Sequence, residues 1–219
     1  QTAFGNIDLS VLHSLPKGRI PIKTWVVAAA KRDAAYEWIK KELRETNSQA
    51  FIVCPLIDQS ETLTTVKAAT TEFARLKKIF SPLTVGLLHG RMKPDEKTDA
   101  LTRLHDRKTD ILVSTPVVEV GIDIPEATIM VIEAAERFGL SQLHQLRGRV
   151  GRREKPSYFL LFTENETPEV INRLKALETV HNGPELAELD LKLRGPGELF
   201  GTRQHGIAGF AIATLSDTE

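Results

Sequence analysis

Two short stretches, Ile111-Leu112-Val113 and Ile129-Met130-Val131-Ile132, decide the fold of this chain. Both are apolar at every position, which is typical of strands that are buried on both faces of a parallel sheet. Further strands of this kind are predicted along the chain, over residues 22–30, 51–54, 83–88 and 158–162. Amphipathic patterns between them predict helices over residues 33–43, 64–80, 94–104 and 141–147.

This alternation of strands and helices predicts an α/β fold, in which helices cover both faces of a parallel sheet. Ligands bind such sheets beyond the carboxyl ends of the strands, so the loops after Val113 and Ile132 are candidates for a binding site. Ser141 is predicted to cap the helix that it begins, because its hydroxyl can accept a hydrogen bond from a free backbone N–H.

The pattern changes near residue 164. One amphipathic helix is predicted from Pro168, with a break at Asn182-Gly183-Pro184, and a second follows through Leu193. Residues 194–206 are rich in glycine and proline and predict a structured loop. We therefore divide the chain into a lead-in segment (1–19), an α/β lobe (20–163) and a helical hairpin with its loop (164–219).

Composition narrows the class of protein. The 219 residues include 29 lysines and arginines against 29 aspartates and glutamates, so net charge alone indicates no partner. No apolar run is long enough to cross a membrane. The first residues show no charged segment followed by an apolar one, so we expect no export signal. The single cysteine, Cys54, lies in an apolar run; it is expected to be a buried strand residue in a reducing cytoplasm. No histidine and cysteine spacing indicates a metal site.

The charge is nevertheless segregated. Residues 137–155 hold six basic side chains and one acidic one, whereas residues 164–190 hold seven acidic and two basic ones. The basic segment contains Gln142-Leu143-His144-Gln145-Leu146-Arg147-Gly148-Arg149-Val150-Gly151-Arg152. Arginine grips phosphate oxygens in two places at once, and glycine lets backbone approach a ligand. The string suits a site that stabilises a transferring phosphoryl group, although a single Arg-Gly pair fits a solvated basic turn equally well.

From Gln145 the string resembles motif VI of the superfamily 2 helicases, Gln-x-x-Gly-Arg-x-Gly-Arg. Residues 111–125, from Ile111-Leu112-Val113-Ser114-Thr115 to Gly121-Ile122-Asp123-Ile124-Pro125, resemble motif V, and residues 51–56 are similar to motif IV. Their order matches a RecA-like helicase C-terminal lobe of the P-loop NTPase type. One local difference is Arg153, where the family commonly has a small residue.

The closing segment narrows the resemblance to RecG-type branched-DNA helicases. Arg194-Gly195-Pro196-Gly197-Glu198 and Gly201-Thr202-Arg203-Gln204 resemble their translocation motif, and Leu88-His89-Gly90-Arg91-Met92-Lys93-Pro94 is similar to them as well. The chain contains no Gly-x-x-x-x-Gly-Lys-Ser/Thr loop, which the first lobe supplies in this family. We therefore expect a C-terminal fragment that lacks ATPase activity alone, with its wedge domain and first lobe upstream.

The resemblance implies an ATP site between two lobes, with magnesium ligands on the other lobe. It assigns Arg149 and Arg152 to the γ-phosphate as catalytic residues. Asp123 would bind the ribose, Gly121 would leave room for the nucleotide, and Gln145 would help couple the lobes. The alternatives are a surface salt bridge for either arginine and a turn-forming role for Asp123.

The resemblance also implies contacts with branched DNA, such as stalled forks and Holliday junctions. The candidates for phosphate contacts are Ser114 and Thr115, at a strand end, and Arg91 and Lys93, in the loop after the strand predicted over residues 83–88. A solvated loop explains Arg91 and Lys93 nearly as well. The hairpin and loop would act as a lever that couples ATP-driven closure to movement on duplex DNA. The candidates for that coupling are Arg194, Arg203 and Gln204.

Three other interpretations remain open from the sequence. A transcription-repair coupling factor shares the closing motif, and an RNA polymerase-binding domain upstream would reveal it. A non-catalytic nucleic-acid-binding module would use the fold without ATP, although it would not need the motif arginines. A separate regulatory chain that docks on another ATPase is the third.

Overall fold

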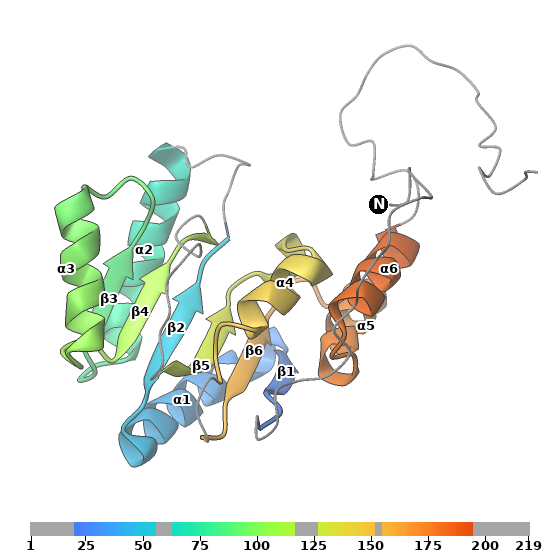
Figure 1. Cartoon of the computed structure of the whole chain (residues 1–219), viewed down its shortest axis with the longest axis horizontal. Coiled ribbons are helices and arrows are strands. Elements are labelled where there is room, and N and C mark those ends of the chain that lie inside the picture. Colours follow the sequence, from blue (N-terminus) through green and yellow to red (C-terminus); the bar gives the residue numbers. More distant parts are fainter. Residues whose placement is uncertain (1–19, 56–62, 117–126, 152–154, 195–219) are drawn as a thin grey trace, which may run out of the picture.

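The computed structural model describes residues 20–55, 63–116, 127–151 and 155–194. Within them lies one sheet of six parallel strands in the order β1-β6-β5-β2-β4-β3 (Figure 1). The chain thus starts at one edge of the sheet, crosses to the other, and returns through the middle. This confirms the predicted α/β fold with a parallel sheet.

The elements follow the predicted alternation. The strands are β1 (Lys23–Val27), β2 (Gln49–Val53), β3 (Val85–Leu88), β4 (Ile111–Ser114), β5 (Ala127–Ile132) and β6 (Tyr158–Phe162). The helices are α1 (Arg32–Thr46), α2 (Leu63–Ile79), α3 (Pro94–His105), α4 (Leu140–Arg147), α5 (Pro168–Thr179) and α6 (Gly183–Arg194). Two short 3₁₀ turns, η1 (Ala29–Lys31) and η3 (Ala135–Arg137), precede α1 and α4. No helix in these described ranges is both long and apolar enough to cross a membrane.

Alternate residues of each central strand serve two separate hydrophobic clusters, one on each face of the sheet. In β5, Met130 and Ile132 face the cluster that includes α4 and α5, whereas Ile129 and Val131 face the cluster under α1 and α2. All four side chains are at most 4% exposed. The continuous apolar runs are therefore explained by burial on both faces.

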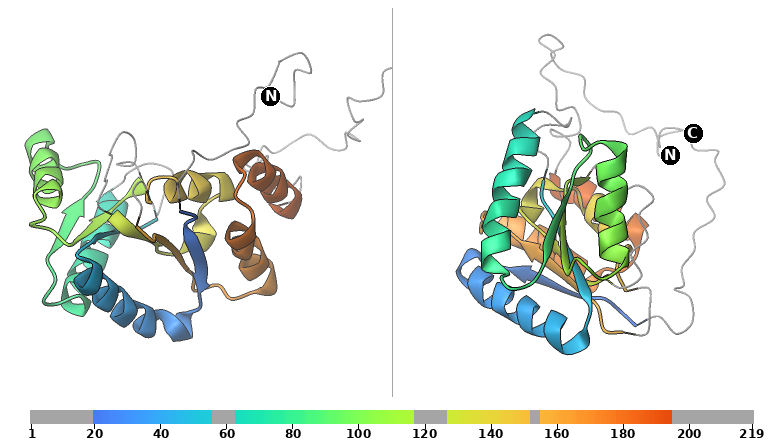
Figure 2. Two further views of the ribbon diagram at one scale, coloured as in Figure 1. Left: turned by 60° about the horizontal axis from the view of Figure 1, so that its bottom comes forward. Right: turned by 90° about the vertical axis from the view of Figure 1, so that its left-hand side faces the viewer.

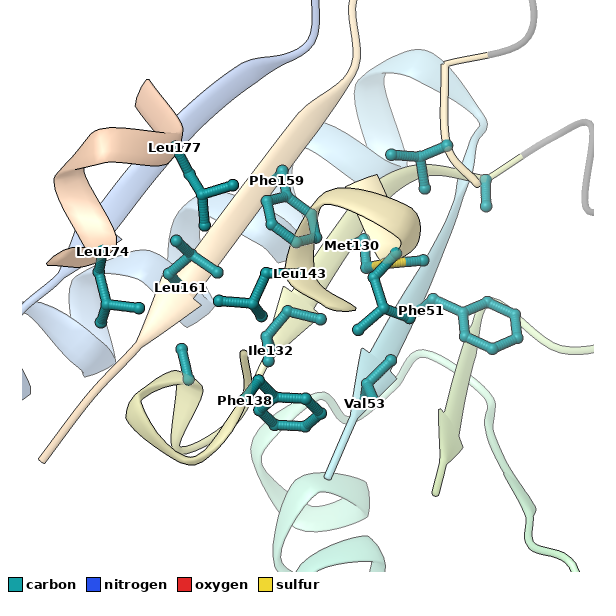
Figure 3. Packing of buried hydrophobic residues seen from close by; sticks show 14 of the residues in the cluster. Phe51, Val53, Met130, Ile132, Phe138, Leu143, Phe159, Leu161, Leu174 and Leu177 are labelled. Atoms are coloured by element: carbon teal, nitrogen blue, oxygen red, sulfur yellow. The ribbon is translucent and has the colours of Figure 1, made fainter. Parts of the chain in front are cut away.

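The helical pair α5 and α6 packs onto the lobe. Leu174 and Leu177 of α5 and Leu186 of α6 are fully buried in the same cluster as Phe159 and Leu161 of β6 (Figure 3). Leu143 of α4 lies in the same cluster. The sheet, α4 and the hairpin therefore share one hydrophobic core.

Two local predictions were wrong. The strand predicted over residues 22–30 ends at Val27, because a 3₁₀ turn starts at Ala29. Ser141 does not cap α4, because the helix begins one residue earlier and its cap is Gly139, which has no side chain to accept a bond. Asp190 supplies an oxygen instead, since its Oδ2 accepts the Leu140 N–H at 3.3 Å.

The two edges of the sheet differ. Beside β1, helix α5 covers the free edge, and Glu178 Oε1 accepts the Val26 N–H at 3.0 Å (Figure 2, left). Glu166 Oε1 accepts the Ala29 N–H at 2.8 Å. At the opposite edge, β3 lies between α2 and α3 (Figure 2, right). The Glu178 carboxylate therefore occupies a position that a further strand would take beside β1, and the Glu166 carboxylate binds the backbone of the turn just after the strand.

Replacing Glu178 by alanine should lower the free energy of unfolding by about 1–3 kcal/mol, because the Val26 N–H loses its partly buried acceptor. Urea denaturation followed by tryptophan fluorescence measures the change. Lys175→Ala, on the exposed side of the same helix, is the matched control. Equal midpoints for the two variants would contradict the role of Glu178 at this edge.

Candidate functional site

Helix α4 contains residues 142–147 of the arginine string, as we call residues 142–152, and has two distinct faces. Leu143, Leu146 and Arg147 face the core, whereas Gln145 is exposed and Arg149 is partly exposed just after the helix. Arg149 lies in the turn that follows the helix, where its N–H donates to the Leu146 carbonyl at 2.9 Å. The structure therefore leaves both predicted site residues at least partly open to solvent, one on α4 and one just after it.

Arg147 points the other way, into the protein. It is 5% exposed, and its guanidinium donates to the Leu177 carbonyl at 2.6 Å and the Val180 carbonyl at 3.1 Å. These are carbonyls at the end of α5, where helical bonds run out. A cation there also meets the negative end of the helix dipole. Arg147 therefore fastens α4 to α5 and is not a phosphate ligand in this arrangement, although the arginine string as a whole suggested one.

His144 completes this contact. Its Nδ1 lies 2.9 Å from Arg147 Nη2, and the arginine can only donate, so Nδ1 is assigned as the acceptor. Burial, and then the charges of Arg147 and His181, lower the pKa of His144 below its ordinary value. The ring also packs against Gly183, where an added Cβ would lie 3.3 Å from it. Neutral His144 thus belongs to the junction of α4 with the start of α6.

A second buried arginine joins the hairpin to the loop before α4. Arg173 of α5 donates to the backbone carbonyls of Phe138 at 3.0 Å and Glu136 at 2.6 Å, and lies 3.4 Å from the Asp190 carboxylate of α6. The same carboxylate accepts the first N–H of α4. Both ends of α4 are therefore fixed to the hairpin, the start by Arg173 and Asp190 and the end by Arg147.

Gly151, the second glycine of the string, has φ +73°, a conformation that side chains rarely adopt. A Cβ there would lie 3.0 Å from the Ile22 side chain and 3.2 Å from that of Ser157. The conformation of the turn therefore explains the glycine at position 151, without any close approach of the backbone to a ligand.

The predicted DNA residues fall into two groups. Arg91 and Lys93 are exposed in the loop between β3 and α3. Ser114 and Thr115 are 2% and 0% exposed, so their hydroxyls are not open to a phosphate in this arrangement. Residues 117–126, which follow them, lie outside the described ranges.

A polar cluster that sequence reasoning missed lies at the carboxyl end of β5. Glu133, 5% exposed, accepts hydrogen bonds from the Tyr36 hydroxyl at 2.8 Å and from Arg32 at 2.9 Å. Burial raises the pKa of Glu133 even though Arg32 and Tyr36 favour its anion. An acidic residue directly after a buried strand was the available signal. The contacts fix α1 to the end of the sheet.

Cys54 is buried, as predicted, and burial raises the pKa of its thiol well above the ordinary value. A thiol in that state is a poor nucleophile, because the thiolate is the reactive form. The described residues contain no cluster of three histidine, cysteine or acidic side chains that could hold a metal.

Several predicted residues lie outside the described part of the chain: Gly121, Asp123, Arg152, Arg203 and Gln204. Arg194 ends α6, and its side chain also lies outside the description. The described site can therefore offer one guanidinium, that of Arg149, and the amide of Gln145 to a ligand. An exposed guanidinium on a fixed helix end fits a phosphate of a nucleotide.

The stability of the chain should fall as pH drops from about 6.5, the ordinary pKa of histidine, through the lowered pKa of His144. The unfolded chain binds a proton in that window that the folded chain excludes, so protonation favours unfolding. Urea midpoints from pH 8 to pH 5 measure the effect. His144→Gln should remove this part of the slope, and His105→Gln, at an exposed histidine, should not; the opposite result would refute the role of His144.

Comparison with known proteins agrees with this geometry. The ATP-dependent DNA helicase RecG of Synechocystis sp. is 48% identical over 219 residues, which is all of this chain and 26% of the relative. RecG of Aquifex aeolicus is 46% identical over 99% of this chain and 27% of its own length. The chain thus spans about a quarter of these relatives.

Solved structures are also similar to this chain. The structure of RecG bound to a three-way DNA junction matches with a TM-score of 0.69 and 42% identity, over 90% of this chain and 25% of that one. Domain 2 of the DEAD-box helicase Mss116p, bound to an RNA duplex, matches with a TM-score of 0.52 and 23% identity, over 78% of this chain and 68% of that one, and supports the fold alone.

The family described as the helicase conserved C-terminal domain matches residues 31–154, which run from the start of α1 through the arginine string. The sheet order and the RecG relatives agree with that match. The chain is similar to RecG along essentially its whole length and belongs to the helicase conserved C-terminal domain family.

Proposed function

We propose that this chain is the C-terminal motor lobe, with its hairpin, of an ATP-dependent helicase that remodels branched DNA during recombination and repair in the cytoplasm. The observation that supports this proposal best is the region of α4: Gln145 on the helix is exposed, Arg149 just after it is partly exposed, and Arg147 fastens the helix to α5. The RecG relatives, whose name states ATP-dependent DNA helicase, support the activity. We propose lobe and hairpin boundaries at 20–163 and 164–219.

The proposed catalytic role belongs to Arg149 and Arg152. ATP would lie between this lobe and a first lobe that supplies the phosphate loop and the magnesium ligands. The two arginines would stabilise charge on the γ-phosphate as the bond to it breaks. Asp123 and Gly121 would hold the nucleoside, and Gln145 would help to couple the lobes. The chain alone is then expected to hydrolyse no ATP.

For DNA we propose phosphate contacts by Arg91 and Lys93, which are exposed in one loop. Ser114 and Thr115 would take part only after a rearrangement that uncovers them, because both are buried here. Branched DNA is the proposed substrate because a 42% identical RecG was solved with a three-way junction. Contacts with phosphates carry no sequence information, which suits recognition by shape.

The hairpin is the proposed lever. Because α4 is joined to it at both ends, by Arg147 and by Arg173 with Asp190, a displacement of α4 would be passed to α5 and α6. Arg194 ends α6, and Arg203 and Gln204 come later in the sequence. These three residues would transmit the movement to duplex DNA.

The proposal is tested with a chimera in which this chain replaces the matching segment of Synechocystis RecG. We expect the chimera to hydrolyse ATP in the presence of a three-way junction and to unwind it, while the chain alone does neither. A folded chimera with no junction-dependent hydrolysis would refute the proposed function. Hydrolysis by the chain alone would show a phosphate site beyond those proposed here.

In the chimera, Arg149→Ala and Arg152→Ala should each lower the rate constant of ATP hydrolysis by about a thousandfold or more, the contribution typical of an arginine finger. Binding of a fluorescent ATP analogue should change little. Arg44→Ala, an exposed arginine on α1, is the control and should match the parent. Full hydrolysis by either variant removes that arginine from the catalytic role.

Gln204→Ala or Arg194→Ala in the chimera should lower the unwinding rate by about tenfold or more, the size of a typical coupling between sites. ATP hydrolysis should persist in both variants, since neither residue is proposed to contact the nucleotide. The two rates are measured on the same three-way junction. Unaltered unwinding would show that the loop is not part of the lever.

A further inference from the structure

The edge strand β3 presents backbone groups that the described chain leaves uncovered. Thr84 O accepts the Ile111 N–H and Leu88 O accepts the Thr115 N–H, so even-numbered residues face β4. In a parallel pair alternate residues bond to the partner strand, and the backbone groups of Val85 and Leu87 therefore point outward. No hydrogen bond to those groups occurs among the described residues, in contrast to the edge at β1, where Glu178 and Glu166 accept N–H groups.

A groove of about 530 Å³ runs along this edge between β3 and α3. Gly86 forms part of its wall, and Met92 and Ala100 add apolar surface. The place of a Gly86 side chain is taken by Thr109 and Leu112, whose side chains would lie 3.0 and 3.1 Å from an added Cβ. In Figure 2 (right) β3 is seen between α2 and α3, with no other described segment across it. An extended peptide could therefore reach the outward N–H and C=O groups of the strand.

The rim of the groove is acidic. Asp95, Glu96 and Asp99 of α3 line it against one cation, Arg103. The Glu96 carboxylate accepts the Lys93 N–H, whereas Asp95 and Asp99 have no ion pair among the described residues. This net negative charge disfavours a nucleic acid, whose phosphates it would repel, and favours lysine or arginine side chains.

We propose that the β3–α3 groove is a docking site for an extended, lysine- or arginine-bearing protein segment, which adds to the sheet beside β3. The backbone of Val85 and Leu87 would supply the ladder bonds, and Asp95 and Asp99 would select basic side chains. The site lies at the opposite edge of the sheet from the hairpin. It adjoins the loop of the proposed DNA contacts Arg91 and Lys93, since Met92 lines the groove, but it does not rest on the proposed function.

The test uses the 219-residue chain labelled with ¹⁵N and a capped hexapeptide of alternating lysine and valine. We expect the peptide to shift the amide signals of Val85 and Leu87 and to slow their hydrogen exchange. Two matched peptides separate the two contributions to binding. One has glutamate in place of lysine, and the other is N-methylated at every residue, so that neither of its edges can donate ladder bonds. Both should bind at least about fivefold more weakly.

The double variant Asp95→Asn, Asp99→Asn should likewise weaken binding by about fivefold. The control removes two exposed carboxylates elsewhere, Glu37→Gln with Glu45→Gln on α1, and should bind as the parent does. Unchanged ¹⁵N spectra away from the substitutions confirm that both variants are folded. The proposal is overturned if no signal at β3 moves, if the N-methylated or acidic peptide binds equally well, or if the shifts lie elsewhere on the chain.

Discussion

The buried guanidinium of Arg147 is the interaction on which the arrangement of the helices depends. A cation without a carboxylate partner among the described residues is costly to bury, unless its N–H groups are satisfied. Here two carbonyls at the end of α5 and the ring of His144 satisfy them. Truncating this side chain would leave the helix end without those donors, so the position tolerates few substitutes. An exposed motif residue, Arg149, thus owes its position to a buried neighbour two residues away.

At the start of α4, too, a charged side chain of the hairpin bonds to free backbone groups. A helix needs acceptors for its first N–H groups, and here the acceptor comes from a different helix, through Asp190. Arg173 meanwhile satisfies carbonyls of the loop that precedes α4. Charged groups of the hairpin therefore complete the backbone bonding of α4, which makes the two parts one polar network as well as one hydrophobic core.

The sequence predicted the sheet well because the central strands β2, β4, β5 and β6 each contain an apolar run that indicates burial on both faces. It predicted helix ends less well. Ser141 is a residue type that favours the N-cap, but the N-cap of α4 is Gly139. The side chain that accepts the Leu140 N–H is Asp190, 50 residues further along the chain, and no local pattern indicates it. It could not distinguish Arg147 from Arg149 either. Both are arginines beside glycine, and only the three-dimensional position of α5 turns one inward. Glu133 was missed for a related reason, since its partners Arg32 and Tyr36 are about 100 residues away.

The pairing of β1 with β6 has a consequence for folding. Lys23 lies beside Tyr158, so among the described strands β1, the first in sequence, pairs only with β6, the last. Loop closure over such a separation is entropically costly and slow, and contacts of this kind lower folding rates. During synthesis β1 stays unpaired until β6 has left the ribosome, and Glu166 and then Glu178 of α5 must follow before the outer side of β1 is covered. Of the six described strands, the one made first is thus the last to be secured, and a chaperone that holds residues 20–30 during this interval would find an unpaired strand.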